Sequence, residues 1–164
     1  MKIKILIPVY NDFKSASKLI VEINSAISNS NEEYSIIIVN DASSDKAEID
    51  ISSINKIKSI KMINMKENQG HARCIATGLK YIFEKNEFDY LIPMDGDGED
   101  RPEEISKFVE FLKYDSSKPI VGERIKRSEG LIFKLSYILH KLITYVFTGH
   151  SIKFGNYTCL PKST

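Results

Sequence analysis

Residues 3–9, with the sequence Ile-Lys-Ile-Leu-Ile-Pro-Val, form a short run of mostly β-branched and apolar side chains. Residues 35–39, Ser-Ile-Ile-Ile-Val, form a second run of the same kind. Both runs are continuous rather than alternating, which is typical of strands buried on both faces in a parallel sheet. The chain is therefore expected to contain two such buried strands.

Helical and extended patterns alternate from this point onward. After Asp12, a predicted helix N-cap, apolar side chains recur at helical spacing as far as Ile27. Further strands are expected near 59–65, at 89–94 and at 119–122, with helices near 70–85 and 102–113. This alternation predicts an α/β protein with a mainly parallel, Rossmann-like sheet and flanking helices.

Composition places the chain among ordinary globular proteins. It has 164 residues, of which 42% are hydrophobic and 27% charged, so disordered, collagen-like and disulfide-scaffold classes are excluded and a single domain is expected. Cys74 and Cys159 stand far apart without ligand spacing, which favours a reducing compartment over a zinc site. The apolar run that begins at Ile3 ends at Pro8, so no signal peptide is expected and a cytoplasmic location is predicted.

The C-terminal part is basic. From Arg124 onward there are seven basic side chains and one acidic one, which suits an anionic partner. Residues 131–148 form a two-faced helical pattern with two lysines and a histidine, so a spanning helix is not expected. Two interpretations stay open: a helix in a membrane interface, or a core helix whose lysines extend outward. Nucleic-acid binding is disfavoured because the N-terminal part is acidic.

Polar side chains follow several of the expected strands. Ligands bind at the carboxyl ends of strands in open α/β sheets, so these segments are the candidate site. The most specific is Asp95-Gly96-Asp97, where two carboxylates two residues apart can share a hard cation such as Mg²⁺ or Mn²⁺. The alternative is a solvated acidic turn in which Asp100 caps the helix that begins near Pro102.

Together these segments resemble family 2 glycosyltransferases of the GT-A fold, especially the polyprenyl-phosphate sugar transferases. The resembling elements are Pro8-Val9-Tyr10-Asn11-Asp12, Asn40-Asp41-Ala42-Ser43-Ser44-Asp45, Asn68-Gln69-Gly70-His71-Ala72-Arg73 followed by Gly78, Asp95 to Glu103, and Gly122-Glu123-Arg124. Asn40 and Ala42 depart from the family's Asp and Gly, and Glu99 stands where this branch usually has Gln.

The resemblance implies roles for individual residues. Donor-nucleotide contacts are expected from Pro8, Tyr10, Asp12, Asp41, Asn68, Gly70, Asp95 and Gly96. Metal ligands are expected from Asp95, Asp97 and Glu99, and the catalytic residues from Asp97, Arg124 and Arg127. The arginines suit phosphate oxygens. His71 is expected to be a surface or helix-start residue rather than a base.

The implied activity is a metal-dependent, inverting transfer of a sugar from a UDP- or GDP-linked donor to a polyprenyl phosphate or a glycan, at the inner face of the cell membrane. Residues 1–125 would bind the donor, and 126–164 would form an acceptor side that is truncated, with a hinge at 126–130. Two alternatives remain: a nucleotidyltransferase, or a non-catalytic nucleotide-binding module. A nucleotidyltransferase should have a Gly-rich basic loop after the first strand, and Asn11-Asp12-Phe13-Lys14 is not one.

Overall fold

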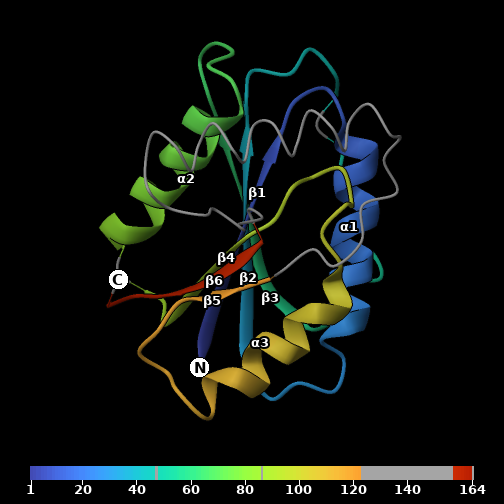
Figure 1. Ribbon diagram of the computed structural model, residues 1–164. Helices are drawn as coiled ribbons and strands as arrows, with labels where there is room; N and C mark the ends of the chain where they lie inside the picture. Colours follow the sequence, from blue (N-terminus) through green and yellow to red (C-terminus); the bar gives the residue numbers. More distant parts are fainter. Residues whose placement is uncertain (47, 86, 123–156, 164) are drawn as a thin grey trace, which may run out of the picture. The chain divides into compact units, whose positions relative to one another are not determined.

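The computed structural model describes residues 1–46, 48–85, 87–122 and 157–163. These residues form a six-stranded sheet with the order β3-β2-β1-β4-β6-β5 (Figure 1). The strands are β1 (Lys2–Val9), β2 (Glu33–Asn40), β3 (Ile57–Asn64), β4 (Tyr90–Pro93), β5 (Ile120–Val121) and β6 (Thr158–Pro161). Neighbours among β1 to β4 are parallel, whereas β6 runs antiparallel to β4.

Helices cover both faces of this sheet (Figure 1). On one face lie α1 (Phe13–Ala26), the short 3₁₀ helix η1 (Pro102–Glu104) and α3 (Ile105–Leu112); α2 (His71–Lys85) lies on the other. Helix α1 begins as predicted, because the Asp12 side chain accepts a hydrogen bond from the Ser15 backbone N–H at 3.1 Å. The predicted α/β class with a mainly parallel sheet is confirmed.

The continuous apolar runs are explained by burial on both faces. In β1, Ile5 and Ile7 belong to the core beneath α1 and α3, while Leu6 belongs to the core beneath α2. Strand β2 divides in the same way, with Ile36 and Ile38 on the first side. Both strands therefore need apolar residues at successive positions, and alternation is lost.

Helix α2 approaches the sheet closely at Gly78. A Cβ atom at this position would lie 2.3 Å from Leu6 Cδ1 and 2.9 Å from Val39 Cγ2. Only a residue without a side chain lets the helix backbone lie this near β1 and β2. This packing holds the first residue of α2 over the carboxyl ends of the strands.

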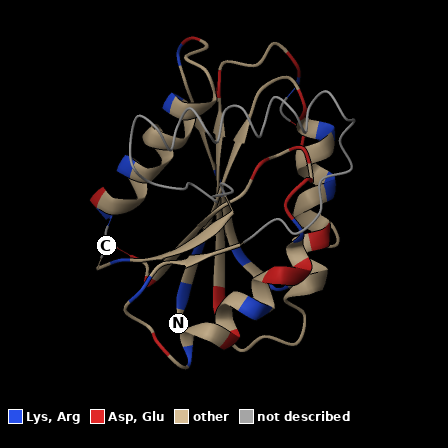
Figure 2. Cartoon of the chain, viewed as in Figure 1, with Lys and Arg blue, Asp and Glu red and all other residues tan. Residues whose placement is uncertain are grey.

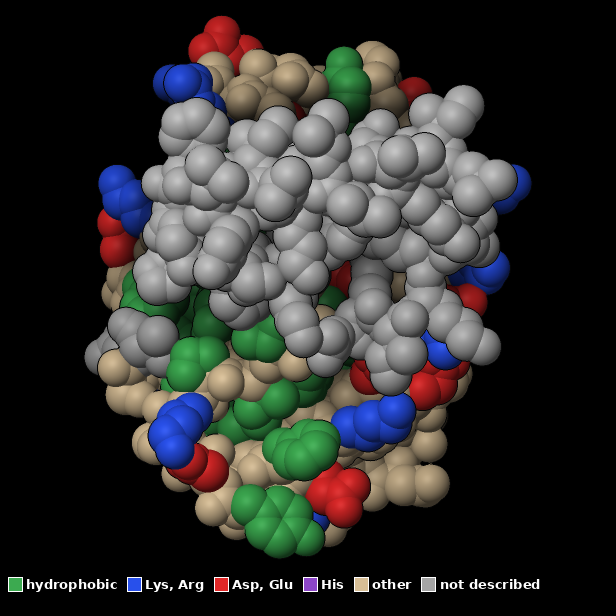
Figure 3. Space-filling view, in the orientation of Figure 1, with side chains coloured by type: hydrophobic (Ala, Val, Ile, Leu, Met, Phe, Trp, Pro, Cys, Tyr) green, Lys and Arg blue, Asp and Glu red, His purple; other side chains and the backbone are tan. Residues whose placement is uncertain are grey.

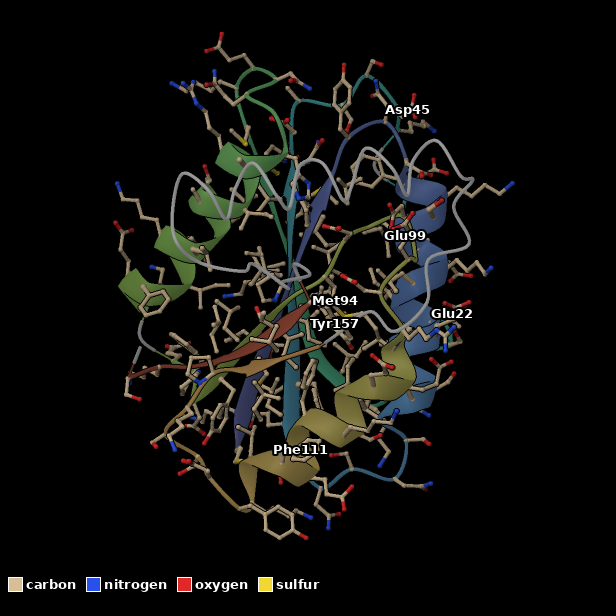
Figure 4. All side chains as sticks on the ribbon, in the orientation of Figure 1. Glu22, Asp45, Met94, Glu99, Phe111 and Tyr157 are labelled. Atoms are coloured by element: carbon tan, nitrogen blue, oxygen red, sulfur yellow. The ribbon has the colours of Figure 1, made fainter. Side chains whose placement is uncertain are left out.

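The end of the chain returns to the main sheet, which the sequence did not predict. Strand β6 pairs with β4, and Tyr157 packs edge-on against Phe108 with ring centroids 4.9 Å apart. Tyr157 and Met94, both labelled in Figure 4, belong to the same buried core. The chain divides into two compact units, Met1–Ile120 with Asn156–Thr164, and Val121–Gly155. The expected helix at 131–148 and the hinge at 126–130 lie outside the described residues.

Three further features of the described residues concern exposed apolar side chains, the two cysteines and membrane-spanning helices. Apolar side chains gather on the face seen in Figure 3, and Phe111 and Tyr114, at and beyond the end of α3, are 59% and 83% exposed. Cys74 and Cys159 are both buried free thiols. Within the described ranges, no helix combines the length and the apolar character needed to cross a bilayer.

Candidate functional site

The carboxyl ends of β1 and β4 form a pocket of about 290 Å³. These strands are parallel neighbours, so the segments that follow them emerge on the same edge of the sheet. The pocket is lined by Pro8, Val9, Tyr10, Asp12, His71, Asp95, Gly96 and Asp97. Six of these eight residues were predicted to belong to the site, and the pocket brings them together. Val9 and His71 are the two that were not predicted.

The turn after β1 is fixed to the turn after β2. Asn11 adopts a left-handed backbone with φ of 51°, and its backbone N–H donates to Ser43 Oγ at 2.9 Å. Its side-chain Oδ1 accepts from the Ser44 backbone N–H at 2.8 Å. These bonds set the direction of the chain between Tyr10, which is 54% exposed, and the helix cap Asp12.

The acidic segment after β4 is held by its own hydrogen bonds. Asp95 N–H donates to Asp100 Oδ2 at 3.0 Å, and Glu99 N–H donates to Asp97 Oδ1 at 2.9 Å. Gly96 lies against β1, because a Cβ atom there would be 2.9 Å from the Pro8 carbonyl oxygen. Figure 2 shows the acidic residues along this loop.

Asp100 is not the N-cap of η1, as the acidic-turn alternative predicted, because Arg101 takes that position. The Asp100 side chain is buried and accepts from Asp95, while η1 starts after Arg101 without a side-chain cap. A buried carboxylate that receives a backbone N–H shapes the loop. Asp100 therefore supports the position of Asp95.

Asp95 and Asp97 fit a divalent cation that is shared with a phosphate ligand. Both line the pocket, whereas Glu99, labelled in Figure 4, does not. Among the described residues, no group of three or more His, Cys, Asp or Glu side chains could hold a metal ion. Mg²⁺ is commonly bound by one or two carboxylates plus substrate phosphates, and Asp95 and Asp97 supply two carboxylates to this pocket. A ligand role for Glu99 stays a prediction.

Asp41 joins the end of β2 to the start of α2. It is 3% exposed, and its two carboxylate oxygens accept from the backbone N–H groups of Gln69 and Gly70, each at 2.8 Å. Gly70 has a φ of 84°, which favours glycine. Neither Asp41 nor Gly70 lines the pocket. The structure therefore gives Asp41 a positioning role in the loop, and its predicted nucleotide contact stays a prediction.

The two residues that depart from the family pattern are also placed by local contacts. Asn40 Nδ2 donates to Asn64 Oδ1 at 2.9 Å, and Asn40 Oδ1 accepts from the Ser43 backbone N–H at 2.9 Å. An aspartate at residue 40 could make only the second bond, because a carboxylate has no donor. Ala42 has a φ of 55°, where glycine is favoured.

The His71 side chain was not predicted to belong to the site, although the residue lies in the stretch 68–73 that resembles the family and was expected at a helix start. As the first residue of α2, it lines the pocket, with Nε2 3.3 Å from Asp95 Oδ1. The local sequence offers no signal for this contact, because it depends on how α2 packs against the sheet.

Comparison with known proteins identifies the family. The profile of Glycosyl transferase family 2 matches residues 4–160, nearly the whole chain. The chain belongs to glycosyl transferase family 2. A protein from Photorhabdus laumondii, named undecaprenyl-phosphate 4-deoxy-4-formamido-L-arabinose transferase, is 32% identical over 168 residues. A protein of the same name from Salmonella choleraesuis is 29% identical over 165 residues. Each match covers 99% of this chain and 48% of the relative, so the chain spans about half the length of these curated relatives.

Solved structures share the fold of this family 2 chain. Glucosyl-3-phosphoglycerate synthase from Mycobacterium tuberculosis superposes with a TM-score of 0.66 at 10% identity, covering 98% of this chain and 57% of that one. TarS 1-349 from S. aureus gives a TM-score of 0.56 at 19% identity, covering 80% of this chain and 38% of that one. The predicted GT-A fold is confirmed.

The remaining predicted residues of the family 2 site are divided between two groups. Asn68 is exposed and does not line the pocket. Arg124 and Arg127 lie outside the described residues, so their catalytic roles stay predictions. The nucleotidyltransferase alternative is not supported, because the profile that matches is that of glycosyl transferase family 2.

Proposed function

We propose that this chain carries the donor site of a metal-dependent glycosyltransferase that uses a nucleoside-diphosphate sugar. The observation that carries the proposal is the shared pocket of Tyr10, Asp12, Asp95 and Asp97 at the carboxyl ends of β1 and β4. Two neighbours of the same fold support it, since TarS was solved with UDP and the M. tuberculosis synthase with Mn²⁺ and UDP.

Charge explains what the pocket residues do. When the bond between the anomeric carbon and the diphosphate oxygen breaks, the leaving diphosphate gains negative charge. A bound Mg²⁺ or Mn²⁺ supplies a Lewis acid for that charge. Asp95 and Asp97 would hold and orient that cation. The exposed Tyr10 ring offers a flat apolar surface at the pocket wall. Arg124 and Arg127 are proposed to add positive charge toward the same oxygens.

We propose a polyprenyl phosphate as the acceptor. Support comes from the two relatives, whose names specify undecaprenyl phosphate. A lipid phosphate is already an anionic nucleophile, so its oxygen forms the new bond to the anomeric carbon without a general base. A glycan hydroxyl would need a base, and no residue of the chain has been assigned that role. The non-catalytic module remains the alternative.

Nucleotide titration tests the donor site. UDP and GDP are titrated into the full chain by calorimetry, each with Mn²⁺ and with EDTA. We expect one nucleotide to bind in a metal-dependent manner, and Asp97→Asn to weaken that binding about tenfold or more. Asp45→Asn is the control, because Asp45 is an exposed acid outside the pocket. Equal affinity with EDTA and Mn²⁺ would refute the metal assignment.

A transfer assay separates the enzyme from the non-catalytic module. The same sample is incubated with a radiolabelled nucleotide sugar and polyprenyl phosphate, with Mn²⁺ present. Labelled lipid is expected to form in a wild-type reaction and to be lost in Asp97→Asn. Metal-dependent nucleotide binding without labelled lipid would support the binding module instead.

A further inference from the structure

His71 occupies a distinctive place in the pocket. Among the described residues that line it, His71 is the only one with a nitrogen-bearing side chain, whereas Asp12, Asp95 and Asp97 are acidic. Its Nε2 atom lies 3.3 Å from Asp95 Oδ1. A carboxylate oxygen can only accept a hydrogen bond, so His71 can donate to Asp95 only from an Nε2 atom that carries a hydrogen.

The backbone of His71 is fixed from two sides. Asp41 accepts the N–H of Gly70, the residue before it, and the Cys74 N–H donates to the Gly70 carbonyl at 3.0 Å. Further along α2, Gly78 packs against β1 and β2. The start of the helix is thereby held over the sheet edge, and the imidazole is presented to Asp95.

The backbone of Asp95 is fixed as well. Its N–H donates to Asp100 Oδ2, and the preceding Met94 N–H donates to the Leu6 carbonyl at 2.9 Å. The side chains are accessible, with exposed fractions of 24% for Asp95 and 52% for His71. Two rigid backbones therefore meet through one side-chain contact that faces the pocket.

We propose that His71 is a positioning residue that holds the Asp95 carboxylate in place for binding the metal–diphosphate group. Groups that hydrogen-bond to metal-ligating carboxylates fix their orientation, and losing such a group commonly costs 10- to 100-fold in metal affinity. The two atoms are 3.3 Å apart, and hydrogen bonds at active sites are often long or poorly aligned until the ligand binds. This inference rests on the proposed function, because it takes Asp95 as a metal ligand.

Two substitutions isolate the Nε2 donor. His71→Phe keeps a planar ring and removes both nitrogens, whereas His71→Gln keeps an N–H donor at a similar distance from the backbone. Mn²⁺ is titrated by calorimetry into the full chain saturated with UDP. The Kd for Mn²⁺ is expected to rise about tenfold or more in His71→Phe and to stay near the wild-type value in His71→Gln. Urea unfolding without metal is expected to be the same for all three proteins.

Each outcome has a defined meaning. Wild-type affinity for Mn²⁺ in His71→Phe would overturn the inference while leaving the proposed function intact. Equal losses in His71→Phe and His71→Gln would also overturn it, because the Nε2 donor would then not be the active feature. Failure of the wild-type protein to bind Mn²⁺ with UDP would refute the metal-dependent donor site itself.

Discussion

Gly70 donates its backbone N–H to Asp41 Oδ2 at 2.8 Å, which fastens the start of α2 to the carboxyl end of β2. Gln69 donates to the other oxygen of the same carboxylate at 2.8 Å. Asp41 is buried, so both oxygens depend on these protein donors rather than on bulk water. Because His71 follows directly, this bond also decides where the imidazole stands relative to Asp95.

Asp41→Asn is therefore expected to destabilise the protein. Asparagine has one acceptor oxygen, so one of the two backbone N–H groups would face an NH₂ group instead. Hydrogen bonds to charged groups contribute about 1.5–3 kcal/mol each, and we expect a loss of that size in the free energy of unfolding by urea. Asp45→Asn, at an exposed acid of the neighbouring loop, should change it little. Equal effects of the two substitutions would contradict this account.

Ala42→Gly is expected to stabilise the protein. Ala42 has a φ of 55°, a conformation that costs an L-residue roughly 1–2 kcal/mol. Glycine removes this strain but loses about 0.4–1 kcal/mol through the greater freedom of the unfolded chain. A net gain of about 0.5–1 kcal/mol should appear in urea unfolding. Ala76→Gly, at an exposed position inside α2, makes the same change in a helix and should lose about 1 kcal/mol. A loss at both positions would argue against strain at Ala42.

Most of the fold could be predicted from local sequence, and the exceptions share a cause. Continuous apolar runs predict strands β1, β2 and β4. An N-cap residue followed by apolar side chains at helical spacing predicts α1. Strand β6 has four residues, includes Pro161, and is completed by pairing with β4 some seventy residues earlier. Because this strand forms only by pairing with so distant a partner, its own sequence carries no clear strand pattern.

The candidate site also contains residues that the local sequence predicts and residues whose place depends on tertiary packing. Tyr10, Asp12, Asp95 and Asp97 come together because each follows a strand, and the ends of parallel strands meet at one edge. His71 joins them through the packing of a helix, which no local pattern reveals. Asp41 follows a strand as well, but its carboxylate turns to the backbone of another loop, which the family pattern did not indicate.

Stability is expected to fall in alkaline solution above pH 9. Burial raises the pKa of the Cys74 thiol to about 11 and that of Cys159 to about 12, from an ordinary value of 9.0. Below pH 9 both states keep these protons, whereas between pH 9 and about 11–12 the unfolded chain releases them and the folded protein does not. In this pH range each thiol lowers the free energy of unfolding by about 1.4 kcal/mol per pH unit.

Urea unfolding at pH 8, 9, 10 and 11 measures this fall. The variant with Cys74→Ala and Cys159→Ala should start from a lower stability at pH 8 and lose less as the pH rises. Burial also raises the pKa of Tyr157, so part of the alkaline loss should remain in the variant. Parallel pH curves for the two proteins would show that the thiols do not contribute.

Binding to anionic bilayers is expected to depend on the basic helical pattern at 131–148. Each lysine near such a surface contributes about 1 kcal/mol, so Lys134→Glu with Lys141→Glu should sharply reduce co-sedimentation with anionic vesicles at low salt. Lys56→Glu with Lys66→Glu, at exposed positions of the described part, makes the same charge change elsewhere. If both double variants bind like the wild type, or the wild type does not bind, the segment is not a membrane contact.

Gly78→Ala is expected to destabilise the protein by crowding one neighbour on β1. The added Cβ atom would lie 2.3 Å from Leu6 Cδ1, so the helix or the leucine must move. Overpacking of this kind costs about 1–3 kcal/mol. Leu6→Val removes the δ carbons and should relieve part of that cost, giving a favourable coupling energy of about 0.5–3 kcal/mol in a double-mutant cycle by urea unfolding.

Leu19→Val is the matched control for that cycle. Leu19 is as fully buried as Leu6, but it belongs to the core beneath α1, on the other face of the sheet. Its combination with Gly78→Ala should be additive to within about 0.5 kcal/mol, because the two sites share no neighbour that must move. Since α2 also carries His71, Gly78→Ala should in addition weaken Mn²⁺ binding in the presence of UDP, and Leu6→Val should restore it in part. An additive Leu6 cycle would show that the helix absorbs the added methyl group without pressing on β1.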